Sequence, residues 1–209
     1  MMSGAEKMEF VSVDTYLATE LFAHTKCEYV DGWIRAMTGA TNRHNHVKLN
    51  TTFSLMKSLA GQPCQVWDSD TKIRVFYQQF KRFYYPDIQV VCEPNLPTES
   101  FQDRPVLVVE VLSPSTRLYD LDEKLTAYTQ IPTLQYYLIL EQHQPIVILL
   151  RRNGDLFERL EFQSTESVID LPALGVRIAM RDIYNGVSFT PTCVQENELR
   201  YEDAAHSGS

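Results

Sequence analysis

Apolar and polar positions alternate along this chain with two different periods, one typical of helices and one typical of strands. Helical spacing predicts a short first helix after Ser12 and longer helices over residues 42–60 and 118–130, the last ending before Pro132. Runs rich in β-branched and aromatic residues predict strands. The expected strands are 27–30, 33–37, 65–67, 71–77, 84–91, 106–112, 135–141, 146–151, 156–162 and 171–178, followed by a helical turn at 180–184.

This order of elements predicts an α/β (α+β) fold in which helices flank a mixed central β-sheet. Asp31-Gly32 is typical of a two-residue hairpin turn. The strand–helix–strand step at 106–140 predicts one parallel crossover within the sheet. A chain of 209 residues suits a single domain, expected at 10–190, with a flexible N-terminus at 1–9 and a disordered tail at 191–209.

The composition indicates a soluble globular protein, with 44% hydrophobic and 22% charged residues. No apolar run approaches the ~18–20 residues that span a membrane. The first residues also lack the apolar core of a secretory signal. We therefore expect no membrane contact and a cytoplasmic protein. Four widely spaced cysteines, with no C-x-x-C pair, are expected to remain reduced thiols.

A single carboxylate, that of Glu110, interrupts the apolar run at 106–112. Such a run is typical of a central strand buried on both faces. An ionised side chain there costs several kcal/mol unless it is paired, hydrogen-bonded or bound to a cation. Glu110 is therefore expected either to form a buried ion pair or to lie at the centre of a functional site.

Two further residues are candidates for a site around Glu110. Asp87 follows Pro86, which cannot donate to a β-ladder, within another mostly apolar run. If the two strands are neighbours in register, Asp87 and Glu110 share a face and could hold a divalent cation together. Lys124 lies on the next helix, which would return over the end of the sheet. Its ammonium could orient a water molecule or stabilise charge on a phosphorus atom.

The net charge of −8 argues against indiscriminate binding to nucleic acid, although it leaves room for a local basic face. It also suits carboxylates that hold Mg²⁺ or Mn²⁺. Paired carboxylates alone would fit a glycoside hydrolase too, but that interpretation gives Lys124 no role. One group of basic residues has two possible explanations, contacts to phosphate or exposure on a solvated hairpin. Its members are Lys72, Arg74, Lys81 and Arg82.

Several motifs along the chain occur together: Glu28-Tyr29-Val30-Asp31-Gly32, Pro86-Asp87, Val108-Val109-Glu110-Val111-Leu112-Ser113-Pro114-Ser115-Thr116, Asp120, Lys124-Leu125 with Tyr128, and Tyr136-Tyr137-Leu138-Ile139. In this combination they resemble the Uma2 family, which is common in cyanobacteria and has the restriction-endonuclease-like PD-(D/E)XK fold. The resemblance extends from about residue 10 to about 187. It implies a single restriction-endonuclease-like domain that uses Mg²⁺ or Mn²⁺, and no organic cofactor, to hydrolyse phosphodiester bonds in DNA.

The resemblance also implies roles for individual residues. Asp87 corresponds to the metal-binding aspartate and Glu110 to the second acid of the motif. In the wider superfamily a lysine follows that acid by two positions, where this chain has Leu112. The resemblance therefore implies that Lys124 takes over the role of that lysine. The main-chain carbonyl of Val111 would be an additional metal ligand.

Two accessory residues follow from the same resemblance, the acid Glu28 and the histidine His46. Because a nuclease that cuts both strands of a duplex commonly acts as a pair, a homodimer is plausible. The main alternative keeps the fold without the chemistry, as a catalytically inactive module that binds nucleic acid or protein. The absence of a lysine at position 112 and the acidic net charge favour that alternative.

Overall fold

The computed structural model of the protein describes residues 10–37, 39–114 and 117–189. The ends predicted to be flexible or disordered, 1–9 and 191–209, lie outside these residues. Described helical elements are α1 (Val13–Glu20), α2 (Asn42–Ser58), α3 (Arg117–Tyr119), the π-helical segment η1 (Asp120–Lys124), α4 (Leu125–Tyr128), the 3₁₀ turn η2 (Pro172–Leu174) and α5 (Met180–Ile183). Described strands are β1 (Cys27–Val30), β2 (Trp33–Ala36), β3 (Gln65–Asp68), β4 (Lys72–Tyr77), β5 (Phe80–Tyr84), β6 (Ile88–Val91), β7 (Phe101–Gln102), β8 (Pro105–Leu112), β9 (Tyr136–Glu141), β10 (Val147–Asn153), β11 (Leu156–Phe162), β12 (Val168–Leu171) and β13 (Val176–Ala179).

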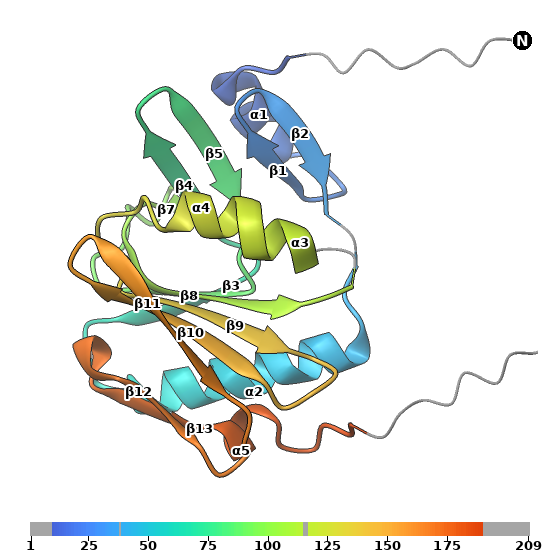
Figure 1. Ribbon diagram of the computed structural model, residues 1–209. Helices are drawn as coiled ribbons and strands as arrows, with labels where there is room; N and C mark the ends of the chain where they lie inside the picture. Colours follow the sequence, from blue (N-terminus) through green and yellow to red (C-terminus); the bar gives the residue numbers. More distant parts are fainter. Residues whose placement is uncertain (1–9, 38, 115–116, 190–209) are drawn as a thin grey trace, which may run out of the picture.

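The large sheet has the order β11-β10-β9-β8-β6-β3, and a second sheet has the order β2-β1-β5-β4-β7. Strands β8 and β9 pair in parallel, whereas the other pairs of the large sheet are antiparallel. The chain passes from β8 to β9 through α3, η1 and α4, which lie on the large sheet next to the second sheet (Figure 1). The predicted mixed sheet, its crossover and the α/β fold class are therefore confirmed.

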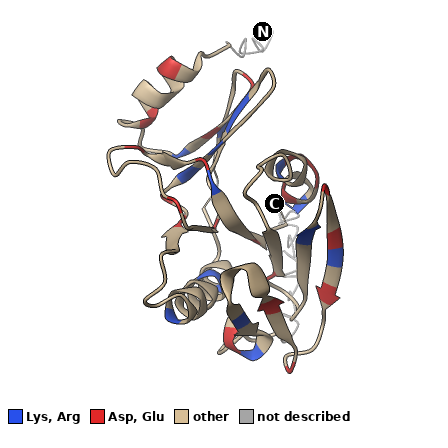
Figure 2. Cartoon of the chain, turned by 90° about the vertical axis from the view of Figure 1, so that its left-hand side faces the viewer, with Lys and Arg blue, Asp and Glu red and all other residues tan. Residues whose placement is uncertain are grey.

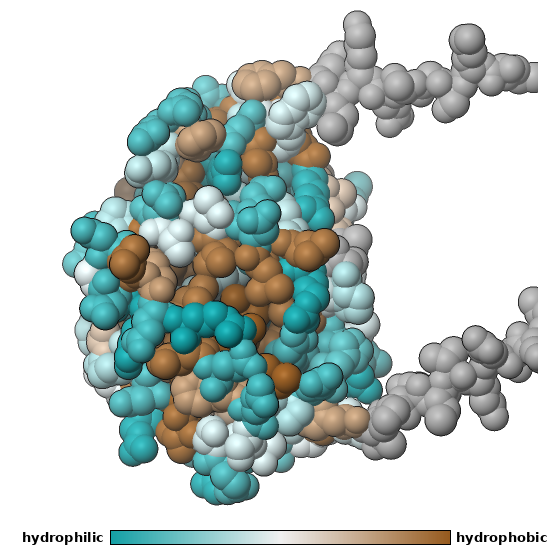
Figure 3. Space-filling view, viewed as in Figure 1, coloured by the Kyte–Doolittle hydropathy of each residue, from teal (hydrophilic) through white to brown (hydrophobic). Residues whose placement is uncertain are grey.

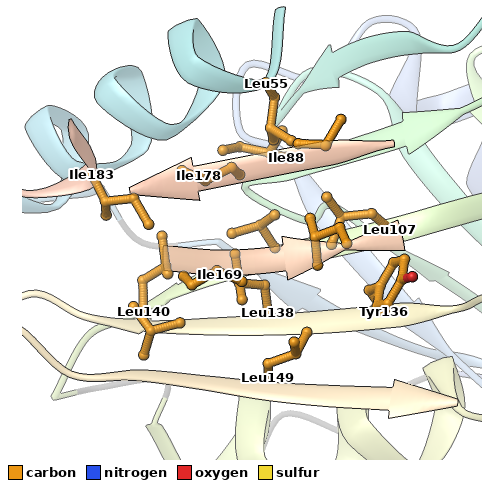
Figure 4. Packing of buried hydrophobic residues seen from close by; sticks show 14 of the residues in the cluster. Leu55, Ile88, Leu107, Tyr136, Leu138, Leu140, Leu149, Ile169, Ile178 and Ile183 are labelled. Atoms are coloured by element: carbon orange, nitrogen blue, oxygen red, sulfur yellow. The ribbon is translucent and has the colours of Figure 1, made fainter. Parts of the chain in front are cut away.

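Strand β8 separates two hydrophobic clusters because its side chains alternate between the faces of the sheet. Leu107 and Val109 pack with α2, α5 and the β12–β13 hairpin, and Figure 4 shows Leu107 among the side chains of this cluster. Val108 and Leu112 pack on the opposite face with Tyr128 of α4. Glu110 shares that second face, so its carboxylate points toward the α3–α4 segment rather than toward α2.

The run predicted as one strand at 84–91 is two strands in different sheets. The break falls at Tyr85, Pro86 and Asp87, between β5 and β6. Because Pro86 has no N–H to donate, the ladder is easily interrupted there. The helix predicted at 118–130 also contains the π-helical segment η1, a feature that often marks functional sites.

The helix predicted over residues 42–60 is present as α2, but the apolar residues whose spacing predicted it face outward. Leu49, Phe53 and Met56 have relative exposures of 62%, 68% and 58%. The buried face instead carries His44, Val47, Thr51 and Leu55, also at helical spacing. The face shown in Figure 3 carries a separate group of apolar side chains ringed by hydrophilic ones.

A disulfide joins Cys64, just before β3, to Cys92, just after β6. The expectation of reduced thiols is therefore wrong for this pair, because antiparallel pairing of β3 and β6 brings together two residues that are 28 positions apart. Cys27 is a free thiol, and Cys193 lies outside the described residues. The bond ties edge strand β3 to its neighbour. No helix among the described residues is long and apolar enough to cross a membrane.

Candidate active site at the junction of the two sheets

A cavity of about 370 Å³ opens where the two sheets meet. It is bordered by the loop before β1, the β2–α2 connection, the first turns of α2, the β3–β4 turn, the β5–β6 break and the end of β8. The titratable side chains in its lining are Lys26, His44, Lys48, Tyr85, Asp87, Glu110, Asp120 and Lys124. The structure therefore brings the three predicted catalytic residues, Asp87, Glu110 and Lys124, to one cavity.

Asp87 lies directly before β6, which pairs antiparallel with β8. The register places Ile88 opposite Val109, so one further step places Asp87 opposite Glu110. The Asp87 Oδ2 atom accepts a hydrogen bond from the main-chain N–H of Val111 at 2.8 Å. Asp87 thus closes the β6–β8 ladder with its side chain, at the point where Pro86 has removed a backbone donor.

Glu110 is buried and contacts two side chains from the crossover segment. Its Oε1 atom lies 3.1 Å from Lys124 Nζ and accepts a hydrogen bond of 3.1 Å from Tyr128 Oη. The expected buried ion pair is therefore present, and the same carboxylate also lines the cavity.

Lys124 is held by two further carboxylates. Its Nζ atom lies 3.1 Å from Glu28 Oε1 and 3.3 Å from Asp120 Oδ1. Asp120 and Lys124 are the first and last residues of η1, and the side chains of both are buried. Glu28 also accepts a hydrogen bond from the main-chain N–H of Tyr85 at 3.2 Å, which links the ammonium to the β5–β6 break.

Burial raises the pKa of Glu110 well above its ordinary value of 4.5, and the neighbouring carboxylates of Asp120, Asp87 and Glu28 raise it further, although Lys124 opposes them. Burial alone would lower the pKa of Lys124. The surrounding carboxylates, Glu110 above all, outweigh that effect and raise this pKa well above its usual range. Lys124 is therefore the protonated partner, and the cluster around it carries an excess of acidic groups.

The excess of acidic over basic side chains around Lys124 is compatible with a bound divalent cation. The acids Glu28, Glu110 and Asp120 surround the ammonium of Lys124, and Asp87 lies next to Glu110 as a fourth acid. Within the described residues, no group of three or more His, Cys, Asp or Glu could hold a metal ion together. Mg²⁺ nevertheless commonly binds through one or two carboxylates and keeps several waters. Asp87 and Glu110 are two carboxylates of the cavity that could bind an ion in this way, whereas Glu28 and Asp120 contact the ammonium of Lys124.

The histidine at this site is His44, not the expected His46. His44 Nε2 lies 3.2 Å from Asp87 Oδ2, and its side chain is 10% exposed. His46 is exposed and lies against Gly186, after α5. Residues two apart on a helix point in different directions, so only one of them can face the cavity. The signal that would have identified His44 is its helical spacing with Val47, Thr51 and Leu55.

Three of the four basic residues predicted as possible phosphate contacts at 72–82 have partners within the fold. Lys72 is 4% exposed and donates to Tyr85 Oη. Arg74 forms two hydrogen bonds to Asp103, of 2.7 and 2.6 Å, and Arg82 pairs with Asp31 at 3.0 Å. Lys81 is exposed but does not line the cavity.

Sequence reasoning also missed two lysines of the cavity lining, Lys26 and Lys48. Lys26 comes two residues before the Glu28–Gly32 motif, whereas Lys48 has no acidic residue near it in the sequence, and no local pattern marks either side chain as part of a site. Asp120 was part of the family motif, and its i,i+4 spacing from Lys124 is the signal that could have predicted their contact.

Comparison with known proteins places this chain among relatives that share most of its length. A model of the Uma2 family, described as "Putative restriction endonuclease", matches residues 13–181. "Uncharacterized protein slr1290" from Synechocystis sp. is 33% identical over 181 residues, which cover 86% of this chain and 94% of that protein. "Uncharacterized protein sll1609" from the same organism is 32% identical over 130 residues, covering 61% and 72% respectively.

A solved structure has the same fold. The crystal structure of a protein described as "a putative nuclease belonging to DUF820", from Anabaena variabilis, superposes with a TM-score of 0.65 over 83% of this chain and 97% of that one. Since the two sequences are 14% identical, this likeness concerns the fold alone. The family match and the relatives, taken with the fold, show that the chain belongs to the Uma2 family.

Proposed function

We propose that the protein is a Mg²⁺-dependent endonuclease that hydrolyses phosphodiester bonds in DNA. The observation that carries the proposal is the position of Asp87 opposite Glu110 in one cavity, with the Lys124 ammonium on the Glu110 carboxylate. The family description and the nuclease-like fold support the same reaction class. DNA as the substrate and the metal requirement are our inferences.

In this proposal Asp87, Glu110 and the main-chain carbonyl of Val111 would hold the metal ion. A bound Mg²⁺ would lower the pKa of a water molecule and neutralise charge on the phosphate. Lys124 keeps its proton because three carboxylates surround it, and it orients the attacking water. Glu28 and Asp120 act as positioning residues for this ammonium, and His44 positions Asp87.

Removal of divalent cations is expected to abolish cleavage. The test incubates supercoiled plasmid with the purified protein in EDTA, in Mg²⁺ and in Mn²⁺, and measures nicked and linear products. Cleavage that depends on added Mg²⁺ or Mn²⁺ supports the proposal. Equal cleavage in EDTA would contradict it. Binding of DNA without cleavage under every condition would favour the inactive module, for which Leu112, buried at the usual lysine position, is the supporting observation.

We also propose that residues 10–190 act as one domain.

We further propose that two copies of the chain pair through α2. The feature that supports this pairing is the outward stripe of Leu49, Phe53 and Met56 on that helix, since exposed apolar patches commonly mark protein interfaces. Phe53→Asp is expected to shift the protein from dimer to monomer in analytical ultracentrifugation. A monomeric wild type, or an unchanged dimer in Phe53→Asp, would contradict pairing through this surface.

A DNA substrate would place the protein in the cytoplasm, where bacterial DNA lies. Thiol reductants are abundant in that compartment, so the Cys64–Cys92 bond would be exposed to reduction there.

A further inference from the structure

Two lysines from separate elements border the entrance of the cavity. Lys26 lies in the loop between α1 and β1, and Lys48 lies on α2. Both line the same cavity as Asp87 and Glu110. In the view of Figure 2, Lys and Arg residues are interspersed with Asp and Glu residues over the fold. The pair of lysines at the cavity is therefore a local feature and not part of a general basic surface.

Both ammonium groups meet at one residue of the β3–β4 turn. Lys26 Nζ donates to the main-chain oxygen of Ser69 at 2.9 Å. Lys48 Nζ donates to the Ser69 hydroxyl at 3.1 Å. The turn therefore holds the two positive charges side by side, although the residues that carry them are 22 positions apart in the chain (48 − 26).

Within the part of the chain that the structure describes, neither lysine forms a buried ion pair. Lys26 also pairs with Asp70, but the two side chains are 42% and 72% exposed, respectively. Exposed pairs of this kind are worth little and exchange partners readily. Lys48 has the Ser69 hydroxyl, a neutral group, as its partner. This contrasts with Lys124, whose ammonium is enclosed by three carboxylates.

The side chains of Glu110 and Asp87 are 4% and 14% exposed, whereas that of Lys26 is 42% exposed, so the acids lie on the buried floor of the cavity and the lysines toward its rim. A strand of nucleic acid that presents one phosphate to Asp87 and Glu110 must carry its neighbouring phosphates past the rim, because the backbone is continuous. An ammonium at the rim would neutralise such a phosphate and offset the repulsion between the strand and the acidic floor.

We infer that Lys26 and Lys48 form a phosphate-binding pair that holds the DNA backbone next to the bond to be cleaved. This inference rests on the proposed function and extends it, since it names the groups that bind the substrate. Ser69 positions both ammonium groups. The acids Asp87 and Glu110 offer no positive charge to bind a phosphate.

The test measures binding of a short fluorescein-labelled DNA duplex by fluorescence anisotropy in EDTA, over a range of salt concentrations, so that cleavage does not interfere. Lys48→Ala is expected to weaken binding roughly tenfold at low salt, and Lys26→Ala with Lys48→Ala to weaken it further. Each lost phosphate contact should reduce the slope of log K against log salt by about 0.9. Lys48→Arg, which keeps the charge, should restore most of the affinity.

Lys57→Ala is the matched control, because Lys57 is an exposed lysine on the same helix and lies outside this cavity. Wild-type affinity and slope in Lys57→Ala, together with the losses in the other variants, would support the inference. Equal slopes in Lys48→Ala, the double variant and the wild type would overturn it. Cleavage by the wild type would in that case leave the proposed function intact. A wild type that binds no DNA would overturn both.

Discussion

Replacement of Lys124 by methionine is expected to lower the free energy of unfolding by about 3–5 kcal/mol. The ammonium of Lys124 lies within 3.3 Å of carboxylate oxygens from Glu28, Glu110 and Asp120. Methionine fills a similar volume but leaves these three acids buried without a cation. The loss should appear as a lower urea midpoint, measured by tryptophan fluorescence at neutral pH with the slope of the transition unchanged.

The loss of unfolding free energy in Lys124→Met should depend on pH. Burial already raises the pKa of Glu110 in the folded protein, and loss of the ammonium would raise it further. A group whose folded pKa lies above its unfolded value stabilises the fold when protonated, and this stabilisation is lost as the pH rises. The deficit of Lys124→Met should therefore shrink as the pH falls from neutral toward the ordinary carboxyl value of 4.5.

Lys57→Met is the control for this stability measurement, because an exposed lysine on α2 should contribute within about 0.5 kcal/mol. A deficit in Lys124→Met that is no larger than in Lys57→Met would show that the acids do not depend on the ammonium. A deficit that grows as the pH falls would also contradict the assignment of Lys124 as the protonated partner.

Asp87→Asn and Glu110→Gln are each expected to reduce the rate of Mg²⁺-dependent DNA cleavage by roughly a thousandfold. The reason is that each change replaces a charged metal ligand, and metal binding supplies several kcal/mol of transition-state stabilisation. Both substitutions keep the size of the side chain. The amide that replaces the Asp87 carboxylate retains an oxygen to accept the hydrogen bond from the Val111 N–H, so the fold should persist.

The measurement compares initial rates of plasmid nicking and also Mn²⁺ affinity by isothermal titration calorimetry. Glu161→Gln is the control, because Glu161 is a surface acid of β11 that pairs with Arg159, away from the cavity. A wild-type rate of plasmid nicking in Asp87→Asn or Glu110→Gln would contradict the assignment of that residue to the active site. Loss of Mn²⁺ binding with intact thermal stability would separate a metal-ligand role from a structural one.

Sequence patterns alone identified the main elements and the buried acid. The apolar run around Glu110 indicated a doubly buried strand, because both faces of β8 had to be apolar to pack against other layers. Asp31-Gly32 indicated the β1–β2 hairpin, and both residues do adopt positive φ, of 49° and 101°. These features depend on neighbours in the chain, which a sequence displays directly.

Patterns were less informative where the outcome depended on which surface another element covers. The apolar stripe of Leu49, Phe53 and Met56 predicted helix α2 correctly, yet the opposite face, with His44, packs on the sheet. The basic residues at 72–82 suggested phosphate contacts, but Arg74 and Arg82 pair with acids brought to them by strand pairing and loops.

The sequence by itself therefore determined the fold class, most of the helices and strands, and the presence of a buried acid, Glu110, that needed a partner. The tertiary structure decided which side chains are its partners and what surrounds them. Lys124 reaches Glu110 and Glu28 only because a crossover segment with a π-helical turn packs between two sheets. Contacts of this kind join residues far apart in the chain, and their energies depend on burial and charge that no local pattern records.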